Sequence, residues 1–248
     1  MKNKIIGVIP ARYKSSRFPG KPLALLLGKP MIIWVAELTS EALGSENVVV
    51  ATDDNRIVEV VNEYGYNFIL TDETHLTGTD RLAEVAKKIE ADIYINIQGD
   101  EPTLNPESIK RVAETKQQYP DFVINAMTTL AKTEDPVNVN IPKVVFNKDL
   151  KLVYMSRLPI PGYKDNKNKP SEYYKQVCIY AFSRDELLQY GKMERKGSLE
   201  KYEDIEILRF FDLNIPIRMI EVEGNSYAVD VKEDVELVEN RLKEIHNL

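Results

Sequence analysis

Residue types that many enzymes use for catalysis and metal binding are scarce in this sequence of 248 residues. A single cysteine, Cys178, excludes an internal disulfide, and two histidines argue against a metal site of the His/Cys type. Cys178 lies in a predicted strand, where a small buried side chain is a better interpretation than a nucleophile. No apolar run approaches the roughly 20 residues of a membrane span. The N-terminal segment lacks the apolar region and cleavage site of a secretory signal, so we expect a cytoplasmic protein.

An excess of positive charge is also missing. The 33 lysines and arginines are outnumbered by 39 aspartates and glutamates, which gives a formal net charge of −6. This balance argues against nucleic acid as the main partner. The hydrophobic fraction of 43% and the charged fraction of 29% are ordinary for a soluble globular protein, and the length allows a substantial core.

Short apolar segments alternate with amphipathic ones over the first half of the chain. The apolar segments are rich in β-branched residues, as buried strands are. This alternation is typical of an α/β protein whose sheet has helices on both faces. We expect strands at 4–10, 47–52, 67–70, 92–97 and 122–127, and between them helices at about 30–43, from Asp54 past Val61, from Thr79 or Asp80 to about Ile89, and at 105–118.

The alternation changes between residues 133 and 182. Two short strands around Asn147-Lys148-Asp149 suggest a hairpin, a proline-rich charged loop covers 158–172, and a strand is expected at 176–182. We interpret 133–182 as an antiparallel insertion within a single domain, residues 1–248, because no linker divides the chain. The remaining elements expected are helices at 184–191 and 198–212, a strand at 216–222 and a helix at 232–246.

The loop that follows the first predicted strand carries four cations, Arg12, Lys14, Arg17 and Lys21. Like charges brought together repel one another unless an anion lies among them, so the loop predicts a phosphate-binding site. It matches neither the P-loop pattern nor G-x-G-x-x-G. The alternative is a solvated basic loop in which Pro10, Pro19 and Pro22 only shape a turn.

Acidic residues follow two other predicted strands. In open α/β sheets ligands bind at the carboxyl ends of the strands, so Asp53-Asp54 and 98–102 are expected beside the basic loop. Carboxylates and substrate phosphates together are the ligands that Mg²⁺ prefers. Capping of the next helix explains Asp53-Asp54 more simply, whereas Asp100 is the better metal candidate.

The sequence closely resembles the CMP-Kdo synthetases, the 3-deoxy-manno-octulosonate cytidylyltransferases. The resemblance covers nearly the whole chain, with the motifs in the expected order. It implies a Rossmann-like nucleotide-binding mixed sheet flanked by helices, and a homodimer that uses a region comparable to 133–182. The matching motifs are IPARY (9–13), SSR (15–17), PGKPL (19–23), VATDD (50–54), TGTDR (77–81), QGDEP (98–102), SRLPIP (156–161) and VD (229–230).

The resemblance implies that CTP is the anion and that CMP is transferred to an acidic sugar with release of pyrophosphate. Gln98 would help to read the cytosine, and Asp100 and Asp230 would hold Mg²⁺. Lys21, Asp100 and Asp230 are the implied catalytic residues. The implied nucleotide-binding residues are Pro10, Ala11, Arg12, Ser15, Arg17, Lys21, Thr52, Asp53, Gly78, Arg81 and Gln98.

The half of the motif set that would hold the sugar acid departs from the family pattern. Gln176 stands where the family has histidine before Ile/Val-Gly-Ile-Tyr-Ala, and Ile207 stands where it has glutamine in Leu-Glu-Gln-Leu-Arg. A lost polar partner penalises a substrate hydroxyl strongly, so we expect an acceptor that can differ from Kdo. The acceptor-binding residues implied are Arg81, Arg157, Gln176, Tyr180, Glu206 and Ile207.

Two other functions compete with this one. A sugar-1-phosphate nucleotidyltransferase would normally begin with a glycine-rich loop, and this chain has no glycine between Pro10 and Gly20. A nucleotide-binding protein without catalysis has no need to retain both Asp100 and Asp230.

Overall fold

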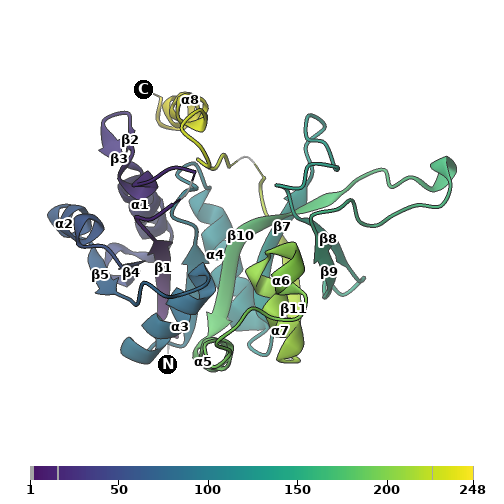
Figure 1. The fold of residues 1–248 in the computed structure, drawn as a ribbon, viewed down its shortest axis with the longest axis horizontal. Coiled ribbons are helices and arrows are strands. Elements are labelled where there is room, and N and C mark those ends of the chain that lie inside the picture. Colours follow the sequence, from purple (N-terminus) through teal and green to yellow (C-terminus); the bar gives the residue numbers. More distant parts are fainter. Residues whose placement is uncertain (1–2, 16, 225, 248) are drawn as a thin grey trace.

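The central sheet combines parallel and antiparallel strands (Figure 1). The computed structural model describes residues 3–15, 17–224 and 226–247. Strand order is β11-β7-β10-β6-β1-β4-β5, and only β10 is antiparallel to its neighbours along this path. The expected α/β fold with a mixed sheet is confirmed. The strands are β1 (Ile5–Ala11), β4 (Val48–Thr52), β5 (Asn67–Leu70), β6 (Ile93–Ile97), β7 (Val123–Thr129), β10 (Tyr174–Ser183) and β11 (Ile217–Glu221), with the small pair β2 (Leu25–Leu26) and β3 (Lys29–Pro30) beside them.

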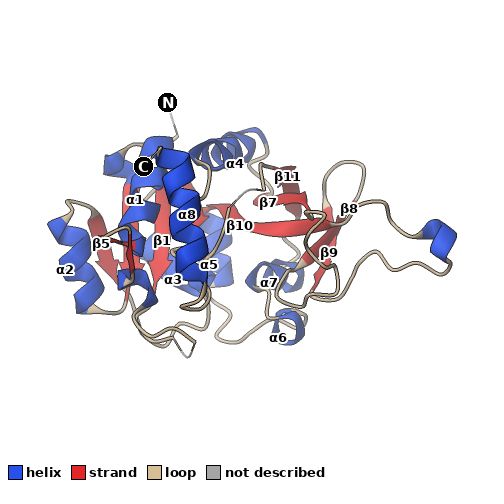
Figure 2. Cartoon of the chain, turned by 90° about the horizontal axis from the view of Figure 1, so that it is seen from above, coloured by secondary structure: helices blue, strands red, loops and turns tan. Residues whose placement is uncertain are grey.

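Helices cover both faces of the sheet (Figures 1 and 2). Successive side chains of a strand point to opposite faces, so β1 sends Ile6 and Val8 into one core and Ile9 and Ala11 into the other. The first core is closed by α3 and α5, and the second by α1 and α4. The helices are α1 (Met31–Leu43), α2 (Asn55–Glu63), α3 (Gly78–Lys88), α4 (Pro106–Gln118), α5 (Arg184–Tyr190), α6 (Glu200–Glu203), α7 (Arg209–Asp212) and α8 (Asp234–His246).

Two expected helices differ from the structure at their ends or in the middle. Helix α3 begins at Gly78 because Thr77, and not Thr79 or Asp80, is its N-cap. The helix expected at 198–212 is interrupted after α6, where Asp204 adopts a left-handed conformation with φ of 51°. A short 3₁₀ turn, η4 (Glu206–Leu208), then leads into α7.

Residues 133–182 contribute both to a projection and to the central sheet. The hairpin of β8 (Lys143–Phe146) and β9 (Leu152–Ser156) pairs with the start of β10. Residues 157–173, which we call the arm, extend far from the body and carry a 3₁₀ turn, Asn166–Asn168 (Figures 1 and 2). The strand β10, expected as the end of the insertion, instead lies between β6 and β7 in the central sheet.

The position of β10 brings distant segments of the chain to one edge of the sheet. Because β10 is antiparallel to β6, its first half continues beyond the carboxyl end of β6, with Ile179 opposite Ile97. The loops that follow β1 and β6 open at the same edge, since these strands are parallel neighbours. Within the described ranges, no helix has the length and apolar character needed to cross a membrane.

Candidate active site

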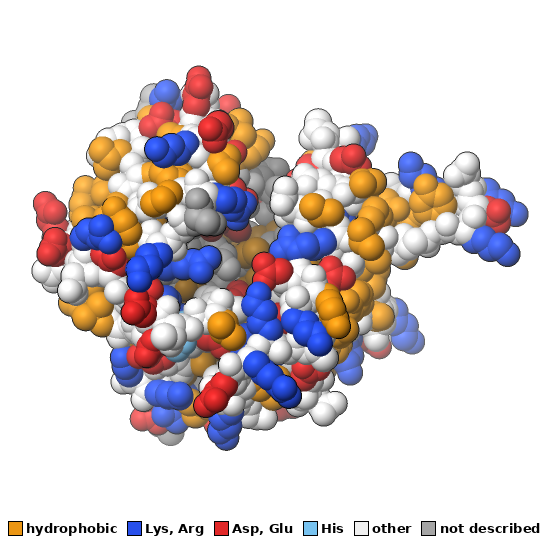
Figure 3. Space-filling model, in the orientation of Figure 1, with side chains coloured by type: hydrophobic (Ala, Val, Ile, Leu, Met, Phe, Trp, Pro, Cys, Tyr) orange, Lys and Arg blue, Asp and Glu red, His pale blue; other side chains and the backbone are white. Residues whose placement is uncertain are grey.

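A cleft with two lobes opens at this edge of the sheet. The first lobe, of about 320 Å³, is lined by the loop after β1 and the start of α3, and we call it the basic lobe. The second, of about 490 Å³, is lined by β10, the 200–206 segment and the chain around Asp230, and we call it the acidic lobe. Figure 3 shows the molecule hollowed between the body and the part that bears the arm. The two lobes share five lining residues: Arg17, Leu76, Thr77, Gln98 and Asp100.

The basic lobe gathers most of the residues predicted to bind the nucleotide. Two of the predicted residues, Thr52 and Asp53, do not line it. Asp53 instead accepts a hydrogen bond of 3.1 Å from the Arg81 guanidinium, which also donates to Thr71, so Asp53 orients an arginine of the wall. The predicted residues that line the lobe are Pro10, Ala11, Arg12, Ser15, Arg17, Lys21, Gly78, Arg81 and Gln98.

Two glycines let the backbone fold tightly around this lobe. Gly20 has φ of 71°, a left-handed conformation that L-residues rarely adopt, and a Cβ there would lie 3.1 Å from the Tyr13 ring. A Cβ on Gly99 would lie 3.0 Å from the Pro10 carbonyl oxygen. The loop after β6 therefore packs at Gly99 against the end of β1, which places Asp100 beside the start of the predicted phosphate loop.

Lys21 lies between the two carboxylates predicted to bind metal. Its Nζ donates to Asp100 Oδ2 at 2.5 Å and to the Val229 carbonyl at 3.0 Å, and it lies 4.0 Å from Asp230 Oδ1. Arg17 approaches the same Asp230 oxygen at 3.2 Å. Residues from the beginning, the middle and the end of the chain thus meet at one point, as their predicted shared role requires.

Three hydrogen bonds hold the segment that carries Asp230 against the loop after β6. The Val229 N–H donates to the Asp100 carbonyl at 2.9 Å, and the Tyr227 N–H donates to Thr103 Oγ1 at 2.7 Å. The Ser226 hydroxyl donates to Glu101 at 3.1 Å. The segment 226–230, which we call the strap, is therefore hydrogen-bonded to the loop that carries Asp100.

The donor set fits a magnesium ion that is partly held by its substrate. Among the described residues no group of three or more histidine, cysteine, aspartate or glutamate side chains could hold a metal by itself. Asp100 and Asp230 nevertheless converge on one cation, the Lys21 ammonium, so the site already balances two negative charges with a positive one. Mg²⁺ is commonly bound through one or two carboxylates plus substrate phosphates, and these two residues would supply the protein's share of such a site.

The acidic lobe receives four of the residues predicted to bind the acceptor: Arg157, Gln176, Tyr180 and Glu206. Gln176 donates to Asn125 Oδ1 at 3.0 Å, which fixes its amide. Burial raises the pKa of Glu206, although its Oε2 accepts the Thr79 N–H at 3.0 Å. Arg81, predicted for both substrates, lines the basic lobe only.

Arg157 lines the acidic lobe, but its guanidinium donates hydrogen bonds to backbone carbonyls of the protein. Its guanidinium donates to the carbonyls of Glu203, Val139 and Asp204, the last two at 2.9 and 3.0 Å. These bonds join the loop before β8 to the end of α6. Arg157 therefore shapes the wall of the lobe, and its predicted contact with a substrate carboxylate would require some of these bonds to break.

Ile207 is the one predicted acceptor residue that lies outside both lobes. Its side chain is fully buried in the core formed with α3 and α5, between the lining residue Glu206 and Leu208. The 3₁₀ turn η4 points adjacent residues in different directions, which a sequence motif does not reveal. The isoleucine is thus a packing residue.

Several lining residues had no assigned role in the sequence. Burial, and then the neighbouring Asp100, raise the pKa of Glu101 to about 7. Cys178 also lines the acidic lobe, where burial raises the pKa of its thiol, so it is a neutral wall residue. Its place in the family pattern Ile/Val-Gly-Ile-Tyr-Ala is that of the glycine, a signal that could have identified it. Lys175 pairs with Glu134 in the same lobe.

His75 lines the basic lobe and is held by an acid behind it. Its Nε2 lies 2.5 Å from Glu84 Oε2, and the same carboxylate accepts the Asp72 N–H at 2.8 Å. The sequence offered no reason to choose between this and an ordinary loop histidine.

Comparison with known proteins agrees with this geometry. The cytidylyltransferase family model matches residues 6–217. A 3-deoxy-manno-octulosonate cytidylyltransferase of Trichlorobacter lovleyi is 38% identical over 97% of this chain and 99% of its own length, and one of Escherichia coli is 40% identical over 95% of both. A solved structure of CMP:2-keto-3-deoxy-manno-octonic acid synthetase complexed with CTP superposes with a TM-score of 0.89 at 40% identity, covering 99% of this chain and all of the other.

A more distant likeness concerns the fold alone. A glucose-1-phosphate thymidylyltransferase described as putative, from Bacillus anthracis, shares 15% identity with a TM-score of 0.68. This likeness shows that the fold also occurs in a protein described as belonging to the competing class. On its sequence, its two-lobed cleft and its near full-length relatives, the chain belongs to the cytidylyltransferase family, among the enzymes that include the 3-deoxy-manno-octulosonate cytidylyltransferases.

Proposed function

We propose that this enzyme transfers CMP from CTP to Kdo or a closely related sugar acid and releases pyrophosphate. The observation that carries the proposal is the convergence of Lys21, Asp100 and Asp230 where the two lobes meet. In this proposal CTP occupies the basic lobe and the acceptor occupies the acidic lobe. The acceptor hydroxyl attacks the α-phosphorus, the new P–O bond forms as the bond to the pyrophosphate oxygen breaks, and the hydroxyl proton passes to solvent water as pyrophosphate leaves.

The chain's own residues supply positioning and charge. Such transfers need in-line alignment and cations near the phosphate oxygens more than a covalent intermediate. Arg12, Arg17 and Lys21 line the lobe that would receive the triphosphate. Asp100 and Asp230 would hold Mg²⁺, which when bound neutralises phosphate charge and lowers the pKa of a coordinated hydroxyl.

Gln98 lies where it can contribute to both substrates. It lines both lobes, and it follows directly after the end of β6 at Ile97. Its amide can donate and accept at once, which suits a base edge such as that of cytosine. Gln98→Leu should therefore weaken CTP binding without altering the binding of inorganic pyrophosphate.

The acceptor need not be Kdo itself. A specific observation favours a related acid: Gln176 and Cys178, two lining residues of the acidic lobe, replace the histidine and glycine of the family pattern. A thiol in place of a hydrogen atom takes space from the lobe, and an amide cannot carry the charge of an imidazolium.

One assay separates these possibilities. Purified protein is incubated with CTP and Mg²⁺, and pyrophosphate release is measured across a panel of 3-deoxy sugar acids that includes Kdo. Pyrophosphate release that requires Kdo supports the proposal. Release with a different sugar acid but not with Kdo also supports it and identifies the related acceptor. No release with any acid, in a protein that binds CTP by calorimetry, would refute it in favour of a non-catalytic nucleotide-binding protein.

We also propose that the enzyme is a homodimer formed through the arm and the β8–β9 hairpin. Apolar side chains lie exposed there, with Leu158 64% and Val153 58% accessible. A long projection that carries exposed apolar side chains is a surface that a second copy can cover.

A further inference from the structure

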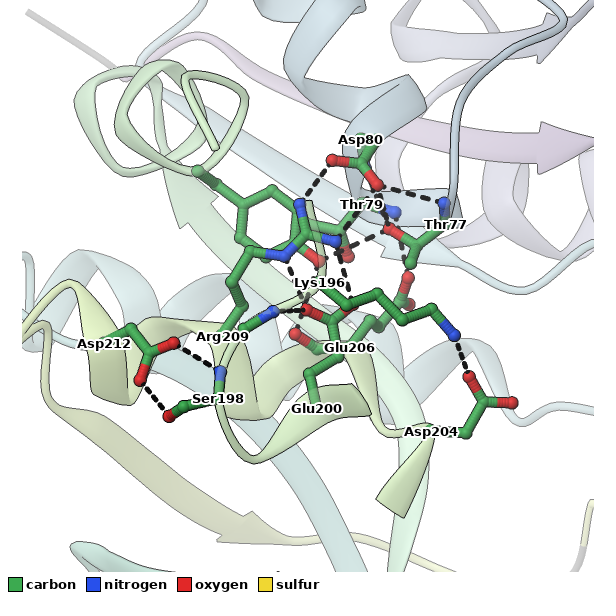
Figure 4. A network of polar contacts seen from close by, with 12 residues as sticks. Thr77, Thr79, Asp80, Lys196, Ser198, Glu200, Asp204, Glu206, Arg209 and Asp212 are labelled. Atoms are coloured by element: carbon green, nitrogen blue, oxygen red, sulfur yellow. Dashed lines mark hydrogen bonds and ion pairs between the residues drawn. The ribbon is translucent and has the colours of Figure 1, made fainter. Parts of the chain in front are cut away.

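A buried arginine between the two lobes touches neither of them. Arg209, at the start of α7, has no exposed surface. Its Nη1 and Nη2 donate to the two carboxylate oxygens of Asp80 at 2.5 and 3.2 Å, and its Nε and Nη2 donate to those of Glu200 at 2.6 and 2.8 Å. The guanidinium carbon lies 4.0 Å from the centre of the Tyr190 ring. Figure 4 shows Arg209 with Asp80 and Glu200.

The first partner of Arg209 supports the wall of the basic lobe from behind. Asp80 Oδ2 accepts the N–H and the hydroxyl of Thr77, at 3.0 and 2.8 Å, and this capping box fixes the first turn of α3. Gly78 in that turn lines the basic lobe, and Thr77 lines both lobes. The position of Asp80 therefore sets the position of the wall that would face the nucleotide.

The second partner belongs to the acidic lobe. Glu200 lines that lobe and also accepts the Gly197 N–H at 2.7 Å. The chain at Gly197 passes so close to Arg209 that a Cβ there would lie 3.1 Å from the Arg209 Cα. Two further contacts join the start of α3 to other elements: Glu206 of the acidic lobe accepts the Thr79 N–H (Figure 4), and the Tyr190 hydroxyl lies 3.3 Å from Thr77 Oγ1.

We propose that Arg209 is a positioning residue that couples the two lobes, so that a nucleotide in one orders the wall of the other. The inference rests on the proposed function, in which CTP occupies the basic lobe. A buried ion pair is weak evidence for stability because desolvation opposes the attraction, and fixed geometry is an alternative reason to keep one. The Arg209 fork is rigid and bidentate, so a shift of Asp80 is transmitted to Glu200.

The chain offers a matched control for this cluster. Glu186 occupies the third position of another capping box, with Ser183, and it pairs with a buried cation, Lys116, at 2.7 Å. Asp80 occupies the same position of the box of Thr77 and pairs with Arg209. Asp80→Asn and Glu186→Gln therefore each remove the charge of a capping carboxylate that is paired with a buried cation. Only Asp80→Asn alters the Arg209 cluster that joins the lobes.

Hydrogen exchange measured by mass spectrometry, with and without CTP and Mg²⁺, tests the coupling without any acceptor. In the wild type we expect CTP to protect the loop 10–21 and also to slow exchange at 197–209, by roughly fivefold or more, as expected for a coupling between sites. In Asp80→Asn the protection of 197–209 should be lost while that of the loop remains. Glu186→Gln should behave as the wild type does.

The outcomes separate the inference from the proposed function. Two results would overturn the coupling and leave the proposed function standing. One is a wild type in which CTP protects the loop but not 197–209, and the other is an Asp80→Asn variant in which both segments remain protected. Absence of loop protection would overturn the assignment of CTP to the basic lobe, and the coupling with it. Equal loss in Glu186→Gln would show a general effect of buried charge and would also refute the role of Arg209.

Kinetics with the acceptor that the panel assay identifies give a second readout. Asp80→Asn should lower kcat about tenfold and raise the acceptor KM, with a much smaller change in the KM for CTP, because misplacement of bound substrates acts mainly on the reacting geometry. If Asp80→Asn does not fold, Arg209→Lys, which keeps the charge and loses the fork, takes its place. An unchanged kcat in the folded variant would contradict the inference.

Discussion

At the scale of single residues, charge decides which side chains are essential. Asp100 and Asp230 each point a carboxylate at Lys21, and neither packs in the core. Their proposed role depends on negative charge and not on shape. An amide of the same size removes the charge and leaves the volume unchanged.

Asp100→Asn or Asp230→Asn should reduce pyrophosphate release by at least about 100-fold, as the loss of one electrostatic contact to a transition state commonly does. The circular dichroism spectrum and Tm should remain close to those of the wild type. Asp149→Asn, in the exposed turn of the hairpin, is the control. Near-normal turnover in either variant would remove that residue from the proposed magnesium site.

The acceptor preference should also depend on two residues. Gln176→His combined with Cys178→Gly restores the family pattern on β10 and enlarges the acidic lobe by one side chain. We expect kcat/KM for Kdo to rise about tenfold, because a single group in a pocket has effects of that order. Cys178→Ser, which keeps the volume, should change little. Wild-type turnover of Kdo as efficient as that of a relative assayed alongside would contradict the expectation.

Ile207→Gln should harm the protein, although it too restores the family pattern. Ile207 is fully buried beside Leu208 and Phe210, where an amide finds no partner. We expect the free energy of unfolding to fall by about 2–4 kcal/mol. Urea unfolding measures it, and an unchanged midpoint together with improved Kdo turnover would show that the side chain turns toward the lobe.

At the scale of elements, the sequence predicted the strands better than it predicted where a helix is interrupted. The apolar segments that became β1, β4 and β6 are short, β-branched and flanked by turn residues, so local chemistry determines them. The interruption after α6 depends on Asp204 in a left-handed conformation and on the close passage of Gly197 over Arg209. Both are consequences of tertiary packing, which periodicity does not report.

The same distinction holds for the site. Nine of the residues that the motif resemblance implied for nucleotide binding line the basic lobe, because that lobe is built from contiguous loops. The wall of the acidic lobe is assembled from β10, η4 and segments near α6. Of two adjacent residues there, Glu206 lines the lobe and Ile207 is buried in the core. No spacing rule predicts which residue of a 3₁₀ turn faces a cavity.

The loop after β1 should act as a unit on the triphosphate. Arg17→Ala should weaken CTP binding on the order of tenfold, the value of one charge-assisted contact, and should weaken CMP binding much less. Calorimetry with both nucleotides measures this. Lys29→Ala is the control, since Lys29 pairs with Glu37 and lines neither lobe. Equal losses for CTP and CMP would contradict a role at the distal phosphates.

At the scale of the whole molecule, burial of an acid near the site makes stability depend on pH. The pKa of Glu101 is about 7 in the fold against an ordinary value of 4.5, so between these values the folded protein binds more protons than the unfolded chain. Its stability therefore falls as pH rises from 4.5 to 7, by up to about 3 kcal/mol.

Glu101→Gln should remove this contribution. Urea unfolding in EDTA should show the variant gaining stability relative to the wild type at pH 8 but not at pH 4.5. The exposed Glu107→Gln provides the control. A difference between wild type and Glu101→Gln that is the same at both pH values would show that Glu101 titrates normally.

The arm predicts the state of assembly. Light scattering at micromolar protein should give twice the chain mass of 28.4 kDa. Leu158→Asp should shift the mass toward one chain, because it places a charge at the apolar base of the arm. A monomer in the wild type would overturn the proposed dimer, and an unchanged dimer in the variant would place its interface elsewhere.

The strap that stitches Asp230 to Asp100 also sets an order of events during synthesis. The two aspartates are separated by 130 positions in the sequence. At typical translation rates of about 5–20 residues per second, on the order of ten seconds pass between the first and the second. During that interval the growing chain already contains the sequences of β1, β4 and β6 and the loop proposed to bind phosphate. It holds only one of the two proposed magnesium ligands, so under this proposal the nascent protein could bind CTP before it could consume it.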